Sequence, residues 1–405
     1  MNNQKQKIKI IMVGVGGYGA SYLDYFESGI LNWDMISLEG VVDPYADKSP
    51  HFNMLKNKKI PIFNNLSDFY REKDAQLAVI STPISLHRSQ CETALSNGSD
   101  VLCEKPLVCR LSDWEHIRQA EKSSGKRVGV GFQWSFSPTM LSLKRDILSG
   151  LFGKPIRLKT MICWPRDNNY YDDSTWKGRI YDKDGNYVND SIFANATAHY
   201  IHNIFFLMGQ SLESSLLPIE AKAELYRAKE IETYDTCFLK GVFPNPAKTE
   251  FFYAASHACT IVKSPVFTYE FENATIGFND NDIINANDNS VYARFSDGTE
   301  KIYGNPFTME EESRKLAAML DYIANGADIP CGIETVYPHV YMCDALAKLP
   351  VKNFPDEIKT KNDKGVYCPI LDGALVSCYE KTMLPSELKS GSDPAFSWAE
   401  ESKGV

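Results

Sequence analysis

Near the N-terminus, an apolar run ends in a glycine-rich turn, and this combination limits the possible folds more than any other feature of the sequence. Residues 8–13 read IKIIMV and lead into Gly14, Gly16 and Gly19, which have the spacing Gly-x-Gly-x-x-Gly. The pattern predicts a strand, a turn and a helix. Gly14 would allow the tight turn, Gly16 would let a pyrophosphate approach the backbone, and Gly19 would let the helix pack closely on the strand. The helix N-terminus, with its unpaired N–H groups, would then face the phosphates of a dinucleotide.

An acidic residue follows at the distance where such a domain holds the adenosine ribose. A second apolar run over residues 37–42 ends in Asp43, and the acid of this motif is expected about 20 residues beyond the last glycine. An ionised Asp accepts hydrogen bonds from both ribose hydroxyls and repels the 2′-phosphate of NADP, and no Arg follows closely to offset its charge. We therefore expect NAD, with NADP disfavoured. The alternative is an Asp that only starts a turn before Pro44.

Composition limits the class of protein. The 405 residues suffice for two domains, and a content of 43% hydrophobic and 23% charged residues is typical of a globular protein. The net charge of −9 argues against a nucleic-acid partner. No apolar stretch reaches the ~18 residues of a membrane span, and no signal segment precedes the first strand, so we expect a cytoplasmic protein with no membrane partner. The ten cysteines include no Cys-x-x-Cys pair, which argues against disulfides and structural zinc.

Two patterns of hydrophobicity divide the chain. Up to about residue 149, short apolar runs alternate with amphipathic segments, which predicts an α/β Rossmann domain with a doubly wound parallel sheet. We expect strands at 8–13, 37–42, 77–81, 100–103 and 128–132, and helices at 18–28, 85–97, 112–124 and 138–149. Beyond Gly150, period-two alternation predicts an α+β domain with an open, mainly antiparallel sheet. Helices are expected there at 191–208, 310–325, 334–349 and 371–383.

These patterns suggest three parts of the chain. We expect an NAD-binding domain over residues 1–135 and a substrate and oligomerisation domain over residues 136–349. Residues 350–405 are expected to form a C-terminal extension whose helix packs back on the body.

Further motifs in the first domain are specific in their order and spacing. Residues 77–83 read LAVISTP and are followed by His87, residues 100–107 read DVLCEKPL, and residues 131–133 read GFQ. Together with the glycine-rich turn, they resemble the glucose–fructose oxidoreductase/inositol dehydrogenase (Gfo/Idh/MocA) family. The resemblance covers the whole first domain.

The second domain carries one motif of that family in altered form. Family members have a glycine-rich segment, an Asp, a His four residues later and an Asp three residues after that, on a helix at the edge of the cofactor. The matching positions here are 189–191, Asn195, His199 and His202. At these spacings the last three side chains would share one helix face. The His is kept while both acids are replaced, so the substrate stays open. No third ligand at a metal-binding spacing accompanies the two histidines, so we expect no metal.

The resemblance implies roles for individual residues. Lys105 and His199 would be catalytic and handle the proton of a substrate hydroxyl, with Glu104 positioning Lys105. The implied cofactor-binding residues are Gly14, Gly16, Gly17, Tyr18, Gly19, Asp43, Thr82, Pro83, His87, Glu104 and Gln133. The expected substrate-binding residues are Trp164, Trp176, Arg179, Asn195 and His202, because aromatic rings stack on sugars and an Arg can clamp a hydroxyl or carboxylate. Each residue also has a structural alternative: Lys105 as a surface lysine, and His87, His199 and His202 as buried core residues.

The implied function is an NAD-dependent dehydrogenase acting on a secondary hydroxyl of a sugar, amino sugar or cyclitol. Two alternatives stay open: a glycosidase or lyase that uses tightly bound NAD for transient oxidation, and a non-catalytic NAD-binding protein. The expected partners are a carbohydrate-like small molecule and further copies of the chain. An open sheet with an apolar free face would pair in a homodimer or homotetramer.

Overall fold

The computed structural model describes residues 7–172, 174–279, 289–389, 396–399 and 403–404. Contacts within the chain divide it into two compact units. The first unit comprises the chain up to Pro138 together with Phe307–Tyr337, and the second comprises Thr139–Pro306 together with the chain from Pro338 onward.

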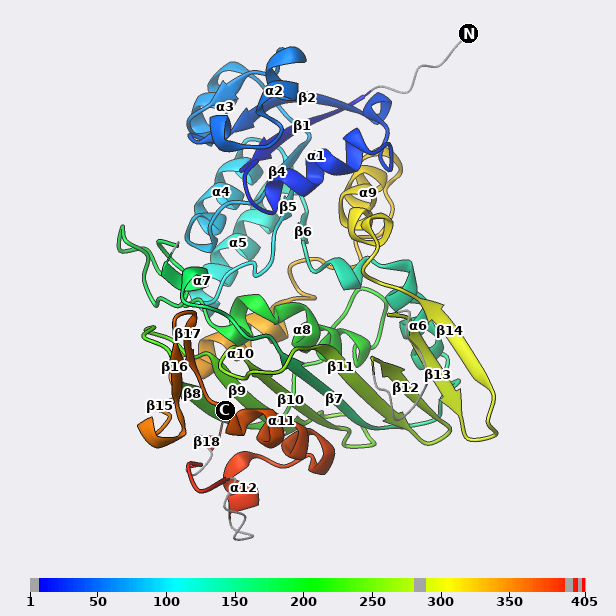
Figure 1. Cartoon of the computed structure of the whole chain (residues 1–405). Helices are drawn as coiled ribbons and strands as arrows, with labels where there is room; N and C mark the ends of the chain where they lie inside the picture. Colours follow the sequence, from blue (N-terminus) through cyan, green and yellow to red (C-terminus); the bar gives the residue numbers. More distant parts are fainter. Residues whose placement is uncertain (1–6, 173, 280–288, 390–395, 400–402, 405) are drawn as a thin grey trace. The chain divides into compact units, whose positions relative to one another are not determined.

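The first unit is built on a six-stranded parallel sheet with strand order β3-β2-β1-β4-β5-β6 (Figure 1). Its strands are β1 (Ile8–Val13), β2 (Ile36–Val42), β3 (Ile62–Phe63), β4 (Leu77–Ile80), β5 (Asp100–Cys103) and β6 (Val128–Val130). Its helices are α1 (Gly19–Glu27), α2 (Phe52–Asn57), α3 (Leu66–Glu72), α4 (Ile84–Ser96), α5 (Leu111–Ser124) and α9 (Met309–Asn325). The doubly wound Rossmann fold is confirmed. It follows from the chain's alternation of fully buried strands with amphipathic helices.

The short elements between β2 and β4 are not among the elements predicted from the sequence. Here α2, β3 and α3 follow one another, and β3 has only two residues. Helix α3 begins after Asn65, whose side-chain oxygen accepts the Asp68 N–H at 2.9 Å. Elements of this length show too few periods of hydrophobicity to be detected.

Helix α9, which we expected in the second domain, packs in the first unit. Thr308 caps its N-terminus by accepting the Glu311 N–H at 3.2 Å, and Gly326 ends it in a left-handed conformation with φ = 73°. The helix contacts α1, β1 and β5. Beyond it, the Val130 N–H of β6 donates to the Cys331 carbonyl at 2.8 Å. The chain therefore returns to the nucleotide-binding fold after leaving it.

The second unit contains a ten-stranded sheet with the order β14-β13-β12-β11-β7-β10-β9-β8-β15, and β18 also pairs with β8. Its strands are β7 (Pro155–Cys163), β8 (Glu220–Arg227), β9 (Thr236–Val242), β10 (Glu250–Ser256), β11 (Lys263–Phe271), β12 (Ala274–Phe278), β13 (Val291–Phe295), β14 (Glu300–Gly304), β15 (Val351–Asn353) and β18 (Lys403–Gly404). Among the strand pairs that the structure describes in this sheet, only β7–β10 and β8–β15 are parallel, so the expected mainly antiparallel sheet is confirmed.

Helices and a small ribbon surround this sheet. They are α6 (Pro138–Leu148), α7 (Asn169–Asp172), α8 (Ala198–Leu207), α10 (Tyr337–Leu346), α11 (Ile370–Lys381), α12 (Pro385–Lys389) and the hairpin of β16 (Thr360–Asn362) and β17 (Gly365–Tyr367). Figure 1 shows α8 and α11 on opposite faces of the sheet.

The single helix expected over residues 191–208 is divided. A π-helical turn over Ile192–Ala196 precedes α8. Thr197 lies between the two, and its hydroxyl donates to the Ile192 carbonyl at 2.6 Å. The same hydroxyl lies 2.5 Å from the Tyr253 hydroxyl on β10. This tertiary contact, which sequence spacing cannot report, favours the wider turn at the start of the helix.

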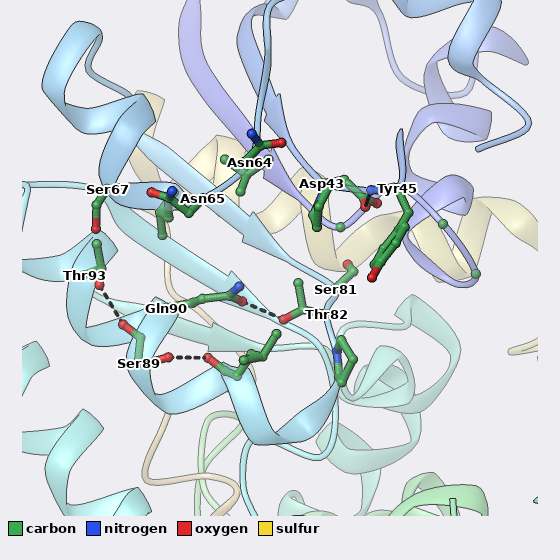
Figure 2. Close-up of a pocket in the computed structure, with 18 of the residues that line it drawn as sticks. Asp43, Tyr45, Asn64, Asn65, Ser67, Ser81, Thr82, Ser89, Gln90 and Thr93 are labelled. Atoms are coloured by element: carbon green, nitrogen blue, oxygen red, sulfur yellow. Dashed lines mark hydrogen bonds between the residues drawn. The ribbon is translucent and has the colours of Figure 1, made fainter. Parts of the chain in front are cut away.

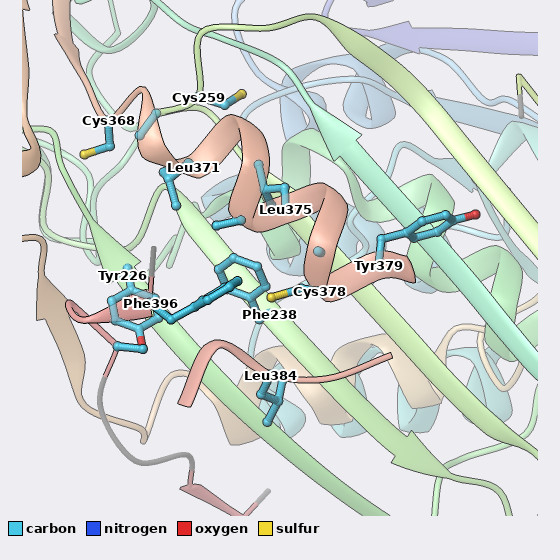
Figure 3. Packing of buried hydrophobic residues seen from close by; sticks show 14 of the residues in the cluster. Tyr226, Phe238, Cys259, Cys368, Leu371, Leu375, Cys378, Tyr379, Leu384 and Phe396 are labelled. Atoms are coloured by element: carbon cyan, nitrogen blue, oxygen red, sulfur yellow. The ribbon is translucent and has the colours of Figure 1, made fainter. Parts of the chain in front are cut away.

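The C-terminal extension covers one face of the sheet with an apolar cluster (Figure 3). Helix α11 contributes Leu371, Leu375 and Cys378, and the strands contribute residues such as Phe238 and Phe252. Leu384, Phe396 and Trp398 from the chain after α11 complete the cluster.

The same face becomes polar toward β14. Glu270 on β11 pairs in register with Thr275, which pairs with Arg294, and Arg294 forms an ion pair with Glu300 at 2.9 Å. In the described residues, this part of the face therefore carries charged side chains beside the exposed Ile302, and the oligomeric state stays a prediction. Among the described helices, none combines the length and hydropathy needed to cross a lipid bilayer.

Candidate functional site

A pocket of about 920 Å³ lies in the first unit, where β1, β2 and β4 end (Figure 2). Of the residues expected at a cofactor, Gly14, Gly16, Gly17, Asp43, Thr82 and Pro83 line it. The pocket is also lined by residues that are not among those predicted from the sequence, such as Tyr45, Lys48, Asn64, Asn65, Ser67, Ser89, Gln90 and Thr93. Most of these belong to the short elements after β2 or to the outward face of α4. The volume and the position, at the carboxyl ends of parallel strands, suit a nucleotide.

The glycine loop has the geometry that its sequence predicts. Gly14 has φ = +84°, and a Cβ there would lie 2.8 Å from the Ser81 carbonyl oxygen. A Cβ on Gly19 would lie 2.3 Å from the Gly14 carbonyl oxygen, so α1 can approach β1 only without one. No atom lies within 4 Å of the position of a Gly16 Cβ, so this part of the loop is open.

The pocket lining also offers an unused donor. The Ser81 hydroxyl is buried and has no hydrogen-bond partner among the described residues. Together with the open loop at Gly16, this group fits a bound dinucleotide.

Asp43 is anchored beside the glycine loop. One carboxylate oxygen accepts the Val15 N–H at 2.9 Å and the other accepts the Tyr45 N–H at 2.8 Å. The Lys48 ammonium lies 4.9 Å from the centre of the Tyr45 ring. A carboxylate has further lone pairs for two ribose hydroxyls, so these backbone bonds orient Asp43 without using up its capacity.

His87 connects two motifs of the first unit. Its ring is 1% exposed, with Nε2 2.9 Å from the Thr82 carbonyl and Nδ1 3.0 Å from the Pro106 carbonyl. Burial lowers the pKa of His87, although the carbonyls oppose the shift. His87 is absent from the pocket lining, and its contacts are those of a structural residue that ties the Thr82-Pro83 turn to the Glu104-Lys105-Pro106 turn.

Glu104 accepts bonds from three parts of the first unit. Its Oε1 accepts the Tyr22 hydroxyl of α1 at 2.6 Å and forms an ion pair with Lys315 of α9, while its Oε2 accepts the Lys105 N–H at 3.2 Å. The side chains of Glu104 and Lys315 are 9% and 0% exposed. Burial lowers the pKa of Lys315, and Glu104 acts in the opposite direction. Glu104 therefore fixes the backbone at the proposed catalytic lysine.

Lys315 is not among the site residues predicted from the sequence. It lies 211 residues from Glu104 in the chain. The signal that could have found it is a charged residue on the buried face of α9, next to Leu316 and one turn from Met319.

Tyr18 and Gln133 join the same network rather than the pocket lining. Lys315 donates to the Tyr18 hydroxyl at 3.0 Å, Tyr18 donates to Gln133 Oε1 at 3.0 Å, and Gln133 Nε2 donates to Glu312 at 3.1 Å. Burial raises the pKa of Glu312. The network connects the glycine loop, the segment after β6 and α9.

In the second unit, Asp190 lies beside the altered motif, in which both expected acids are replaced. Asn195 Nδ2 donates to Asp190 Oδ1 at 2.8 Å, and Asp190 Oδ2 accepts the Gly178 N–H at 2.7 Å. Asn195 and His199 are half-buried. Because Asn195 lies in the π turn and His199 in α8, with Thr197 between these two elements, the shared face expected from a regular helix does not follow from their spacing.

His202 lies in the core of the second unit. It is 1% exposed and stacks on Phe206 with the ring centres 6.1 Å apart. Burial lowers the pKa of His202 well below 6.5, and Lys144 and His339 act in the same direction. This position corrects the expectation that His202 binds substrate, because its side chain lacks an accessible surface.

The aromatic and basic segment over residues 164–179 forms a cluster of rings and cations. The guanidinium carbon of Arg166 lies 5.4 Å from the Trp164 ring centre and 4.9 Å from that of Tyr170, and Lys177 Nζ lies 4.2 Å from the Tyr170 ring centre. Arg179 is exposed and lies 3.7 Å from Glu232.

Trp176 is half-buried in the same segment.

Of the two residues expected to be catalytic, Lys105 belongs to the first unit and His199 to the second. In the parts of the chain that the structure describes, no three His, Cys, Asp or Glu side chains form a metal site.

Comparison with known proteins agrees with this geometry. Residues 8–132 match the model of GFO_IDH_MocA, described as an oxidoreductase family with an NAD-binding Rossmann fold. An inositol 2-dehydrogenase of Acidothermus cellulolyticus is 28% identical over 37% of this chain and 43% of its own length. The inositol 2-dehydrogenase of Salmonella typhimurium is 26% identical over 37% of this chain and 44% of its own length. The chain therefore aligns with less than half of these relatives.

Solved structures share the fold over most of the chain. The WlbA dehydrogenase of Bordetella pertussis, solved with NADH and UDP-GlcNAcA, has a TM-score of 0.66 at 18% identity and covers 85% of this chain and 96% of its own. An Agrobacterium radiobacter oxidoreductase, solved with NAD+, L-tartaric acid and magnesium, has a TM-score of 0.66 at 12% identity, covering 85% of this chain and 98% of its own.

Proposed function

Because residues 8–132 match the Gfo/Idh/MocA oxidoreductase family model, we propose that the protein is an NAD-dependent oxidoreductase. It would transfer a hydride between the nicotinamide and a secondary hydroxyl of a sugar, amino sugar or cyclitol. The observation that carries this proposal is the pocket at the sheet edge, with its open glycine loop and anchored Asp43. The names of the inositol and UDP-GlcNAcA dehydrogenases among the similar proteins support the substrate class.

The chain's own residues would bind and orient the reactants. The N-terminus of α1 and the loop around Gly16 would hold the pyrophosphate, and Asp43 would hold the adenosine ribose. The Ser81 hydroxyl and Thr82 would meet the cofactor farther along the sheet edge. NAD, when bound, supplies the site that accepts or returns the hydride.

Proton transfer would fall to Lys105 and His199. Lys105 Nζ would take or return the proton of the substrate hydroxyl, while Glu104 holds its backbone N–H. Lys315 balances the charge of Glu104. The His199 imidazole would orient the hydroxyl or share the proton. Asn195, fixed by Asp190, would donate or accept one hydrogen bond to a neighbouring substrate hydroxyl.

NAD is proposed as the preferred cofactor over NADP. The Asp43 carboxylate supports this preference, since it would repel a 2′-phosphate, although Lys48 in the same pocket would offset part of that charge. Asp43→Asn keeps a carbonyl oxygen as an acceptor and removes the charge. We expect this variant to lose NAD+ affinity about tenfold and to narrow the NAD+/NADP+ ratio of kcat/KM by at least that factor. Asp47→Asn, a neutralisation four residues later, is the matched control. An unchanged ratio in Asp43→Asn would contradict the assignment.

A panel of sugars, amino sugars and cyclitols tests the reaction itself. Stoichiometric NADH accumulation with one of them supports the dehydrogenase. Release of a free sugar from a glycoside without NADH accumulation supports the hydrolase or lyase. NAD+ binding without either product supports the non-catalytic alternative.

Two wider expectations belong to the same proposal. All ten cysteines are buried free thiols, which supports a reducing, cytoplasmic compartment. Self-association as a homodimer or homotetramer stays a prediction. The apolar part of the sheet face, on which we based it, is covered by the C-terminal extension. Sedimentation of the full chain measures it.

A further inference from the structure

Two cations of the second unit lie against one aromatic ring. Arg166 and Lys177 approach the Tyr170 ring centre to 4.9 and 4.2 Å. The ring itself is fixed by neighbours, since it lies edge-on to Tyr171 at 4.9 Å and to His257 at 5.5 Å. The cations therefore lie against packed aromatic rings.

Neither cation has an acidic partner among the described residues. Arg166 makes two ring contacts, and its backbone N–H donates to the His257 carbonyl at 3.1 Å. Its buried Nε has no acceptor within the described chain. The carboxylate of Asp190, which acts electrostatically on Tyr170 as Arg166 does, accepts from Gly178 and Asn195. A positively charged pair is thus left without a described counter-ion.

Arg179 provides the contrast. It belongs to the same segment, but it is exposed and lies 3.7 Å from Glu232. Its charge is already matched by a carboxylate in solvent. The structure therefore favours Arg166 over Arg179, the residue expected from sequence, as the cation that meets a ligand.

Ring contacts connect Arg166 to the helix that carries His199. Trp164, on which Arg166 lies, packs edge-to-face on Tyr200 with the ring centres 5.6 Å apart. Tyr200 in turn lies 6.4 Å from the ring of His199. The cation pair therefore belongs to the surroundings of the proposed catalytic histidine within the second unit.

We infer that Arg166 and Lys177 bind an anionic group of the substrate, a carboxylate or a phosphate carried by the sugar. A guanidinium can bind such a group through two N–H donors in one plane, and Arg166 lies close enough to two rings for them to hold its position. The inference rests on the proposed function and narrows its substrate class to acidic sugars.

Titration of the NAD+-bound full chain tests the inference. D-Glucuronate, D-glucose 6-phosphate and uncharged D-glucose are titrated by calorimetry at low ionic strength. At least one anion is expected to bind about 10- to 100-fold more tightly than glucose. Tighter binding of glucuronate identifies the group as a carboxylate, and tighter binding of glucose 6-phosphate identifies it as a phosphate. Equal affinities, or no binding of either anion, overturn the inference.

Variants locate the anion. Arg166→Met is expected to remove the preference for the anion, Lys177→Met to reduce it, and Arg166→Lys to keep part of it because the charge remains. Arg179→Met is the matched control and should keep the full preference. An anion preference that survives Arg166→Met and Lys177→Met, with unchanged melting temperatures, overturns the inference.

The readout separates this inference from the proposed function. Binding of the anion can be measured without turnover. NADH formation from the panel of sugars, amino sugars and cyclitols can be measured without an anionic substrate. Oxidation of neutral sugars without an anion preference overturns the inference alone. Anion binding without any hydride transfer overturns the proposed function alone.

Discussion

Two lysines meet Glu104 in different ways, so their roles can be tested separately. Glu104 accepts the backbone N–H of Lys105 and pairs with the side chain of Lys315. A change at Lys105 therefore removes a side chain proposed for chemistry, whereas a change at Lys315 removes the counter-ion of a buried carboxylate.

Lys105→Met is expected to keep NAD+ affinity and to lower turnover by about 100- to 10,000-fold, which is the range for a lost general acid or base. Steady-state kinetics with a substrate from the panel, together with NAD+ titration, provide the measurement. Lys122→Met, an exposed lysine on α5, serves as the control. Normal turnover in Lys105→Met would rule out the catalytic assignment.

Lys315→Met is expected to lower the free energy of unfolding by about 3–5 kcal/mol, because it leaves the Glu104 carboxylate buried without its counter-ion. The double variant Glu104→Gln/Lys315→Met should recover much of that loss, since no buried charge remains. Denaturant unfolding of the single and double variants completes the cycle. Strictly additive losses would show that the two side chains do not stabilise each other.

At the scale of elements, α8 makes the fold sensitive to acid. Burial holds the pKa of His202 well below 6.5, with Lys144 and His339 acting in the same direction. As pH falls below about 6.5, the unfolded chain binds a proton that the folded chain does not, so folding stability falls. His202→Leu should reduce this slope by up to about 1.4 kcal/mol per pH unit. Burial also lowers the pKa of His87 and the pKa of His257, so part of the pH dependence remains in the His202→Leu variant.

Chemical denaturation between pH 5 and 7 measures this slope. The control is His116→Leu, which changes an exposed histidine on α5. A slope in His202→Leu that equals the slope of the unchanged protein would show that His202 is already charged in the folded chain.

Most helices and strands could be predicted from the sequence, except those that are very short or that depend on a tertiary contact. Strands such as β4 and β5 are buried on both faces and read as continuous apolar runs, so their positions follow from the sequence. The short β3 and the π turn before α8 do not, because the first has two residues and the second depends on Thr197 meeting Tyr253. Local patterns report local structure and carry no information on such partners.

At the scale of the whole molecule, the C-terminal extension is part of the core of the second unit. Leu375→Ala removes a fully buried side chain between α11 and the sheet and is expected to cost about 2–5 kcal/mol of unfolding free energy. Glu380→Ala, an exposed position on the same helix, should be nearly neutral. Thermal and denaturant unfolding compare the two. Equal effects would show that α11 does not hold the sheet face as its packing indicates.

The nucleotide-binding fold, its glycine loop and Asp43 could be predicted from the order of residues along the chain. Gly14, Gly19 and Asp43 act through backbone conformation and short-range geometry, which their spacing already encodes. Only the tertiary structure paired Glu104 with Lys315 across 211 residues, and only it placed the extension over the sheet. Only the tertiary structure also distinguished Arg179, which pairs with Glu232, from Arg166, which pairs with no acid among the described residues. Which charges meet depends on where distant segments pack, and the order of residues along the chain does not specify that contact locally.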